Sequence, residues 1–188
     1  MPKLYFRYGT MGASKSANLI MTANNYHSLG HKVGVLKPSI DTRTADTVSS
    51  RTGMSVPVDI LLDGQDDIAI NPDWVAVLVD ECQFLQPFQI DQLRVIAEKI
   101  PVLCYGLRTD YKSHVFPGSL RLLELADSIE EIKMLCACCS RKAVFNAMYR
   151  SNEDGTFSVI REGTSTPVIA GEEIFKALCW NCYSEYSE

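Results

Sequence analysis

A glycine-bearing stretch near the N-terminus constrains the fold more than any other feature of the chain. The apolar, aromatic-rich run KLYFRY at residues 3–8 is typical of a β-strand. Residues 16–30 place apolar side chains near helical spacing and end in Gly30, a candidate C-cap. Residues 9–16, GTMGASKS, lie directly between the two. A strand that runs through such a loop into a helix is typical of α/β folds with a parallel sheet.

The same alternation continues to about residue 130. A strand is predicted at 31–38, and WVAVLVDECQF at 74–84 holds the continuous apolar run of a strand that is buried on both faces. The later predicted elements are a helix at 89–100, a strand at 101–107 and a helix at 119–127. Residues 39–56 are polar and aperiodic, which predicts a long functional surface loop. We therefore expect residues 1–130 to form a parallel sheet flanked by helices, as a nucleotide-binding α/β domain.

Residues 131–188 have a different character, with short β-like runs and paired cysteines, and predict a small second domain. Two C-x-x-C pairs have the spacing of a structural, tetrahedral Zn²⁺ site; they are formed by Cys136, Cys139, Cys179 and Cys182. Cys138 leaves an alternative open, because it could replace Cys139 as the partner of Cys136. The small residue Ser140 favours Cys139, since a turn is needed there.

Composition sets limits on location and partners. The net charge of −5 over 188 residues, without a Lys/Arg cluster, argues against a nucleic-acid-binding face. The chain holds no apolar run long enough for a membrane span and no secretory signal pattern. We expect a cytoplasmic protein with reduced cysteines and no membrane partner.

Residues 9–16 approach the phosphate-binding pattern G-x-x-x-x-G-K-[ST]. Gly9, Lys15 and Ser16 occupy their places in that pattern, whereas Ser14 stands where the second glycine is expected. In such a loop the backbone N–H groups face phosphate oxygens, the lysine neutralises charge and the hydroxyl binds Mg²⁺. Taken alone, the stretch is equally compatible with a tight turn; its place between strand and helix favours phosphate binding.

Asp80 and Glu81 follow the buried apolar run of residues 74–84. A carboxylate at the end of a buried strand organises Mg²⁺ in proteins that use a phosphate loop. An isolated acidic pair at a strand end is more often a solvated terminus. Its combination with Lys15 and Ser16 favours a magnesium site.

These motifs together resemble the type II thymidine kinases. The resemblance spans nearly the whole chain, through LYFRYGTM, IDTR, VDECQF, YGLRTDY, the paired cysteines and PVIAGEEIF. It implies a kinase that transfers the γ-phosphoryl group of ATP to the 5′-hydroxyl of thymidine, with Mg²⁺ and a structural Zn²⁺. It further implies a homotetramer that is inhibited by dTTP.

The resemblance also implies residue roles. Glu81 would be the catalytic general base, and Ser16 and Asp80 would bind Mg²⁺. The residues implied to bind ATP are Gly9, Thr10, Met11, Gly12, Ala13, Ser14, Lys15, Ser16, Asp41, Thr42, Arg43, Asp80 and Gln83. Those implied to bind thymidine are Met11, Phe84, Leu107 and Tyr111, a C-terminal lasso of Thr166, Pro167, Val168, Ile169 and Ala170, and Phe175.

Three residues depart from the family pattern: Ser14 and Ala170 replace glycines, and Phe175 replaces a tyrosine. Serine fits at residue 14 if its φ is negative, and costs about 1 kcal/mol if φ is positive. We expect a helical-side conformation for Ser14 and a functional loop. A catalytically weakened homologue that binds nucleotide or nucleoside is the alternative, supported only by Ser14. A zinc-ribbon interaction module is a third reading, for which Arg141 and Lys142 supply too little basic surface.

Overall fold

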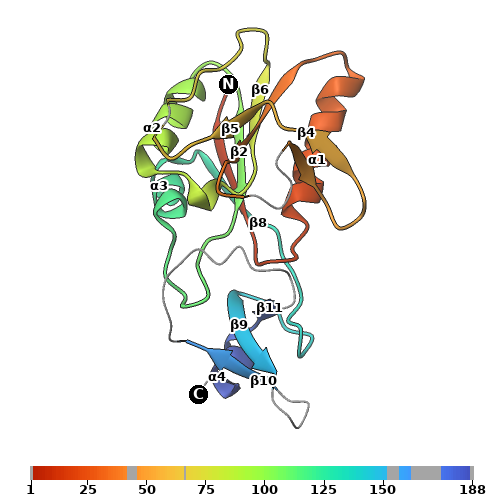
Figure 1. Ribbon diagram of the computed structural model, residues 1–188, viewed down its shortest axis with the longest axis vertical. Helices are drawn as coiled ribbons and strands as arrows, with labels where there is room; N and C mark the ends of the chain where they lie inside the picture. The colour runs from red at the N-terminus through yellow and green to blue at the C-terminus, as the bar shows by residue number, and fades with distance from the viewer. Residues whose placement is uncertain (1, 42–45, 66, 152–156, 162–174, 187–188) are drawn as a thin grey trace.

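The computed structural model describes residues 2–41, 46–65, 67–151, 157–161 and 175–186. Its larger part is a six-stranded parallel sheet in the order β5-β2-β6-β7-β1-β8, flanked by helices (Figure 1). The strands are β1 (Leu4–Tyr8), β2 (Val33–Pro38), β5 (Ile60–Leu62), β6 (Ala76–Val79), β7 (Val102–Gly106) and β8 (Ser128–Glu131). The predicted parallel α/β architecture is confirmed.

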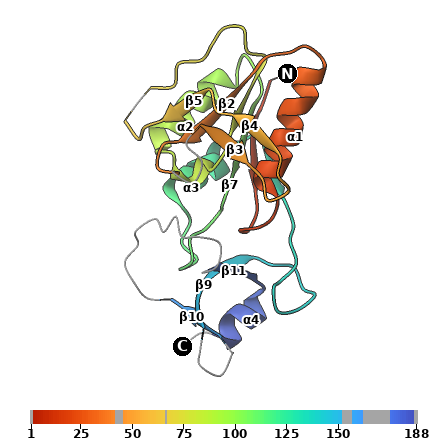
Figure 2. The ribbon, with the colours of Figure 1, turned by 45° about the vertical axis from the view of Figure 1, so that its right-hand side comes forward.

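Helices cover both faces of this sheet (Figures 1 and 2). The helix α1 (Lys15–Ser28) buries Leu19, Ile20 and Ala23 on one face. The helices α2 (Pro87–Ile96) and α3 (Pro117–Leu125) bury apolar side chains such as Ile90 and Leu122 on the other. The period of two along each strand divides its side chains between these two cores.

The central strands are apolar on both faces because both faces are covered. All four residues of β6 and all five of β7 are buried. This explains the unbroken apolar run at the end of which Asp80 and Glu81 stand. The strands β5 and β8, at the two edges of the sheet, are short and were not predicted.

The expectation of a long loop over residues 39–56 is wrong in part. A small antiparallel sheet pairs β3 (Thr47–Ser49) with β4 (Ser55–Pro57). Val48 and Val56 are buried in the core on the α1 side of the large sheet. Two apolar residues in a polar stretch were too weak a periodic signal, but their burial against α1 stabilises the hairpin.

The C-terminal module consists of β9 (Phe145–Ser151), β10 (Phe157–Ile160), β11 (Phe175–Leu178) and α4 (Trp180–Glu185). Its three strands form an antiparallel sheet in the order β10-β9-β11. It has a core of its own that includes Ala147, Val159 and Tyr183. The module lies beyond the edge of the large sheet at which β1 and β7 end (Figures 1 and 2).

Candidate functional site

A cavity of about 810 Å³ opens at the carboxyl ends of the parallel strands. This is the edge at which ligands of open α/β sheets bind. The cavity brings together most of the predicted site residues: Met11, Gly12, Ser14, Lys15, Ser16, Asp41, Asp80, Glu81, Gln83, Phe84, Leu107, Tyr111 and Phe175. Gly9, Thr10 and Ala13 belong to the same loop without lining the cavity. Thr42, Arg43 and Thr166 to Ala170 lie outside the described residues.

The phosphate loop, residues 9–16, curls around the side chain of Lys15. Its ammonium group, although buried, donates hydrogen bonds to the carbonyls of Gly9 at 3.3 Å and Thr10 at 2.9 Å. Gly9 is required sterically, because an added Cβ would lie 2.6 Å from the carbonyl oxygen of Ile132. Gly12 has a φ of +81°, the left-handed region that favours glycine. The loop thus curls around the positive charge of Lys15, at the start of α1.

Ser14 corrects the sequence-based expectation. It has φ 59° and ψ 29°, in the left-handed region rather than on the helical side. It is the N-cap of α1, and its carbonyl accepts a hydrogen bond from the amide of Asn18 at 3.0 Å. A serine Cβ in this region costs about 1–2 kcal/mol relative to glycine.

Asp80 and Ser16 meet across the loop, at a distance of 3.0 Å from Ser16 Oγ to Asp80 Oδ2. Asp80 Oδ1 is buried and accepts no hydrogen bond from any described residue. Burial first, and the neighbouring charge of Glu81 second, raise the pKa of Asp80 to about 7. An unsatisfied carboxylate oxygen beside a serine hydroxyl suits a hard divalent cation, whose charge would favour the ionised carboxylate.

Glu81 is held by its neighbour Gln83. The amide of Gln83 donates to Glu81 Oε2 at 2.6 Å and accepts from the backbone N–H of Leu107 at 2.9 Å. Glu81 itself has a positive φ of 49°. Non-glycine residues in this region concentrate at functional sites. The carboxylate therefore projects into the cavity on a backbone that the surrounding contacts hold in a strained conformation.

Aromatic residues form an apolar wall of the cavity. The rings of Phe84 and Phe116 meet edge to face at 5.7 Å, and Tyr111 is 8% exposed. The turn after Tyr111 is fixed by Asp110, which accepts hydrogen bonds from the amides of Lys112 and His114. These aromatic residues and the phosphate loop line the same cavity, which therefore has an apolar part and a charged part.

Lys37 and Asn146 are among the polar residues of the cavity that were not predicted from the sequence. Lys37 is the last residue but one of β2 and forms an ion pair with Asp41, with 3.1 Å between Nζ and Oδ2. Its position at the end of an apolar strand that precedes the D-T-R triplet was an available signal. Asn146 lies in β9, and nothing in the local sequence indicates that it reaches the cavity.

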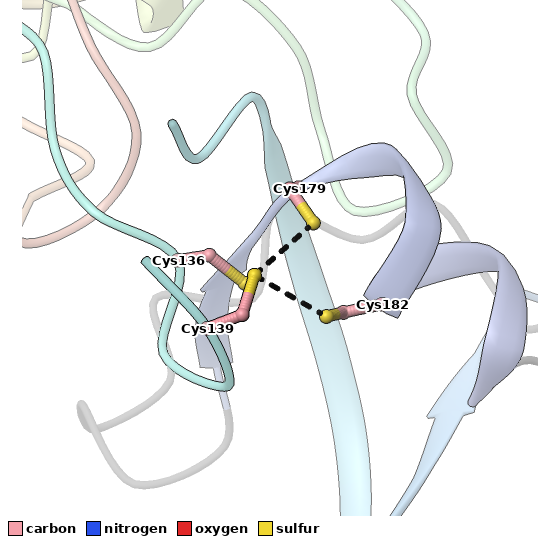
Figure 3. Close-up of side chains that lie close together, drawn as sticks. All are labelled: Cys136, Cys139, Cys179 and Cys182. Atoms are coloured by element: carbon pink, nitrogen blue, oxygen red, sulfur yellow. Dashed lines mark hydrogen bonds between the residues drawn. The ribbon is translucent and has the colours of Figure 1, made fainter. Parts of the chain in front are cut away.

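The four predicted cysteines converge in the C-terminal region (Figure 3). The sulfur atoms of Cys136, Cys139, Cys179 and Cys182 all lie within 4.8 Å of one another. Cys138 is exposed and outside this group, which decides the open alternative in favour of Cys139. Four convergent thiols fit tetrahedral zinc.

Backbone hydrogen bonds favour the thiolate form that metals bind at Cys136 and Cys179, whereas burial raises the pKa of Cys182. Burial raises the pKa of Cys136, but hydrogen bonds from the backbones of Cys138, Cys179 and Cys139 outweigh it and lower the pKa to about 6. A thiol that ionises near neutral pH is a competent metal ligand.

Comparison with known proteins places the chain in a family. The family profile described as thymidine kinase matches residues 2–183. The thymidine kinase of Chromobacterium violaceum is 41% identical over 187 residues, covering 97% of this chain and 98% of the relative. That of Enterobacteria phage T4 is 40% identical, covering 96% of each chain, and that of Haemophilus influenzae is 39% identical, covering 98% and 97%. Of the helices described, none is long and apolar enough to cross a membrane. The chain belongs to the thymidine kinase family.

Proposed function

We propose that the protein is an ATP-dependent thymidine kinase, which transfers the γ-phosphoryl group of ATP to the 5′-hydroxyl of thymidine and releases dTMP and ADP. The observation that carries the proposal is the single cavity shared by Lys15, Ser16, Asp80 and Glu81. It combines a phosphate loop, a candidate cation ligand and the carboxylate of Glu81 near aromatic residues, in a chain of the thymidine kinase family.

ATP would lie with its phosphates along residues 9–16. Lys15 would neutralise part of their charge, and Asp41, Thr42 and Arg43 would approach from the loop after β2. Ser16 Oγ and Asp80 Oδ1 would hold Mg²⁺, which when bound neutralises phosphate charge. The unsatisfied Oδ1 supports this assignment.

Thymidine would lie against the aromatic wall. We assign its pocket to Met11, Phe84, Leu107, Tyr111 and Phe175, and to the segment Thr166 to Ala170. Glu81 would accept the proton of the 5′-hydroxyl as its oxygen forms the new bond to the γ-phosphorus. The bond from that phosphorus to the bridging oxygen breaks at the same time, and ADP leaves with the electron pair. Gln83 would keep the carboxylate of Glu81 aimed at the hydroxyl, supported by its 2.6 Å hydrogen bond.

Several broader assignments belong to this proposal. Zn²⁺ would be structural, because four thiolates fill a tetrahedral site. The division into domains at 1–130 and 131–188 is supported by their separate sheets. Cytoplasmic location, a homotetramer and inhibition by dTTP stay predictions that rest on the family resemblance.

The decisive experiment measures formation of dTMP from ATP and thymidine by the purified protein with Mg²⁺, with thymidine omitted as the control. We expect dTMP and ADP in equal amounts, and no ADP without thymidine. Binding of both substrates without dTMP would instead support the catalytically weakened homologue.

A further inference from the structure

Asn146 connects two loops that belong to a different part of the fold. Its Oδ1 accepts a hydrogen bond from the backbone N–H of Met11 at 2.8 Å. Its Nδ2 donates to the backbone carbonyl of Thr109 at 3.0 Å. Met11 lies in the phosphate loop, Thr109 lies in the segment between β7 and α3, and Asn146 itself comes from β9 of the C-terminal module.

The chemistry of these contacts suits a side-chain amide. A backbone N–H can only donate and a carbonyl can only accept, so the bridging side chain must offer one acceptor and one donor side by side. Asn146 does so while only 4% exposed, and Thr109 is 6% exposed. Loss of the amide would leave two backbone groups unpaired in a site largely shielded from water.

A second contact from the same module supports the same segment. The hydroxyl of Tyr183, in α4, donates to the carbonyl of Tyr111 at 3.0 Å. Met11, Thr109, Tyr111 and Asn146 all line the cavity. We call residues 107–116, between β7 and α3, the nucleoside segment. The C-terminal module thus bonds to the nucleoside segment at two backbone positions, the carbonyls of Thr109 and Tyr111, and to the phosphate loop at the N–H of Met11.

We propose that Asn146 is a positioning residue that sets the distance between the phosphate loop and the nucleoside segment, and so couples the C-terminal module to both halves of the cavity. Its catalytic consequence rests on the proposed kinase function; the coupling itself does not. Because the amide touches the backbone of both loops, it acts on the relative placement of the two substrates.

The coupling is tested directly by amide hydrogen exchange and carbonyl chemical shifts in the substrate-free protein. In Asn146→Leu, similar in size but without the amide, exchange at the Met11 N–H rises on the order of tenfold, because its acceptor is lost. In Asn146→Asp, the Met11 N–H keeps its acceptor and its protection, while the carbonyl shift of Thr109 changes because its donor is gone. Val159→Ala is the matched control, since Val159 is buried in the core of the same module and does not line the cavity.

Kinetics supply the functional test. Asn146→Leu raises KM for both thymidine and ATP, on the order of tenfold in each case, whereas Val159→Ala lowers the melting temperature and leaves both KM values unchanged. Unchanged Met11 exchange together with unchanged KM values in Asn146→Leu would overturn the proposal. If Asn146→Leu does not fold, an unchanged carbonyl chemical shift of Thr109 in Asn146→Asp would overturn the proposal equally. If the native protein forms no dTMP but exchange at the Met11 N–H still rises in Asn146→Leu, the coupling is supported and only the kinase assignment is refuted.

Discussion

Lys37 and Asp41 form an ion pair that is almost completely removed from solvent. The ammonium nitrogen lies 3.1 Å from Asp41 Oδ2, and the two side chains are 1% and 5% exposed. Both line the cavity where β2 ends. Burying two charges is costly even when they are paired, so such a pair is weak evidence of stability and better explained by placement of charge at a site.

Removing one member of this pair takes away the opposite charge that the other, buried member faces at 3.1 Å. We expect Lys37→Met to lower the free energy of unfolding by about 3–5 kcal/mol, measured by urea denaturation. The double variant Lys37→Met/Asp41→Leu recovers much of that loss, because no isolated charge remains. The matched control is Lys32→Met at the exposed pair Lys32–Asp73, whose side chains are 70% and 63% exposed, with a loss of less than about 1 kcal/mol. Equal losses at the two sites would contradict this account.

The positive φ of Ser14 predicts that glycine fits better there. Ser14→Gly should raise the free energy of unfolding by about 1 kcal/mol, because the strain of the Cβ is removed. ATP affinity should rise severalfold at most, since 1.4 kcal/mol corresponds to about tenfold. Ser14→Ala separates strain from chemistry: it keeps the Cβ, loses the hydroxyl and should match the native stability. If ATP binds only to the glycine variant, the native loop is not functional.

Glu81→Gln keeps the shape of the proposed general base and removes its proton affinity. We expect the rate of dTMP formation to fall by about a hundredfold to ten-thousandfold. Thymidine affinity, measured by calorimetry, should stay close to that of the native protein. Glu98→Gln, at an exposed position after α2, is the control for the charge change. Near-native turnover by Glu81→Gln would remove Glu81 from the catalytic role.

Metal analysis tests the cysteine cluster. We expect a single Zn²⁺ per chain in protein purified without chelator, and its loss in Cys139→Ser. Cys138→Ser should retain the metal, because Cys138 is exposed and lies outside the cluster. Strong chelators should lower the melting temperature, since metal binding contributes to folding. Zinc that persists in Cys139→Ser but is lost in Cys138→Ser would reverse the assignment.

What the sequence could predict depended on signals confined to neighbouring residues. The apolar run before Asp80, the glycines of residues 9–16 and the C-x-x-C spacing each encode local geometry, and the parallel sheet and the cysteine cluster followed. Asn146 lines the cavity only because β9 packs next to loops from distant parts of the chain. Its partner Met11, for example, is 135 residues away in sequence. The left-handed conformation of Ser14 was not predicted for another reason. Serine can adopt either sign of φ, and the contacts of the folded loop select the positive one.

The order of strands in the sheet has a consequence for synthesis. Of the six strands of the large sheet, β1 is translated before the other five, yet it pairs with β7 and with β8, so that Leu4 lies opposite Val102 and Tyr8 opposite Glu131. Pairings between such distant parts of a chain form slowly, because long loops must close first. Residues 9–16 directly follow β1, and Gly9 packs against the carbonyl of Ile132. The phosphate loop is therefore translated well before residues 132 and 146, which contact it, and it is among the last parts of the cavity to be held in place.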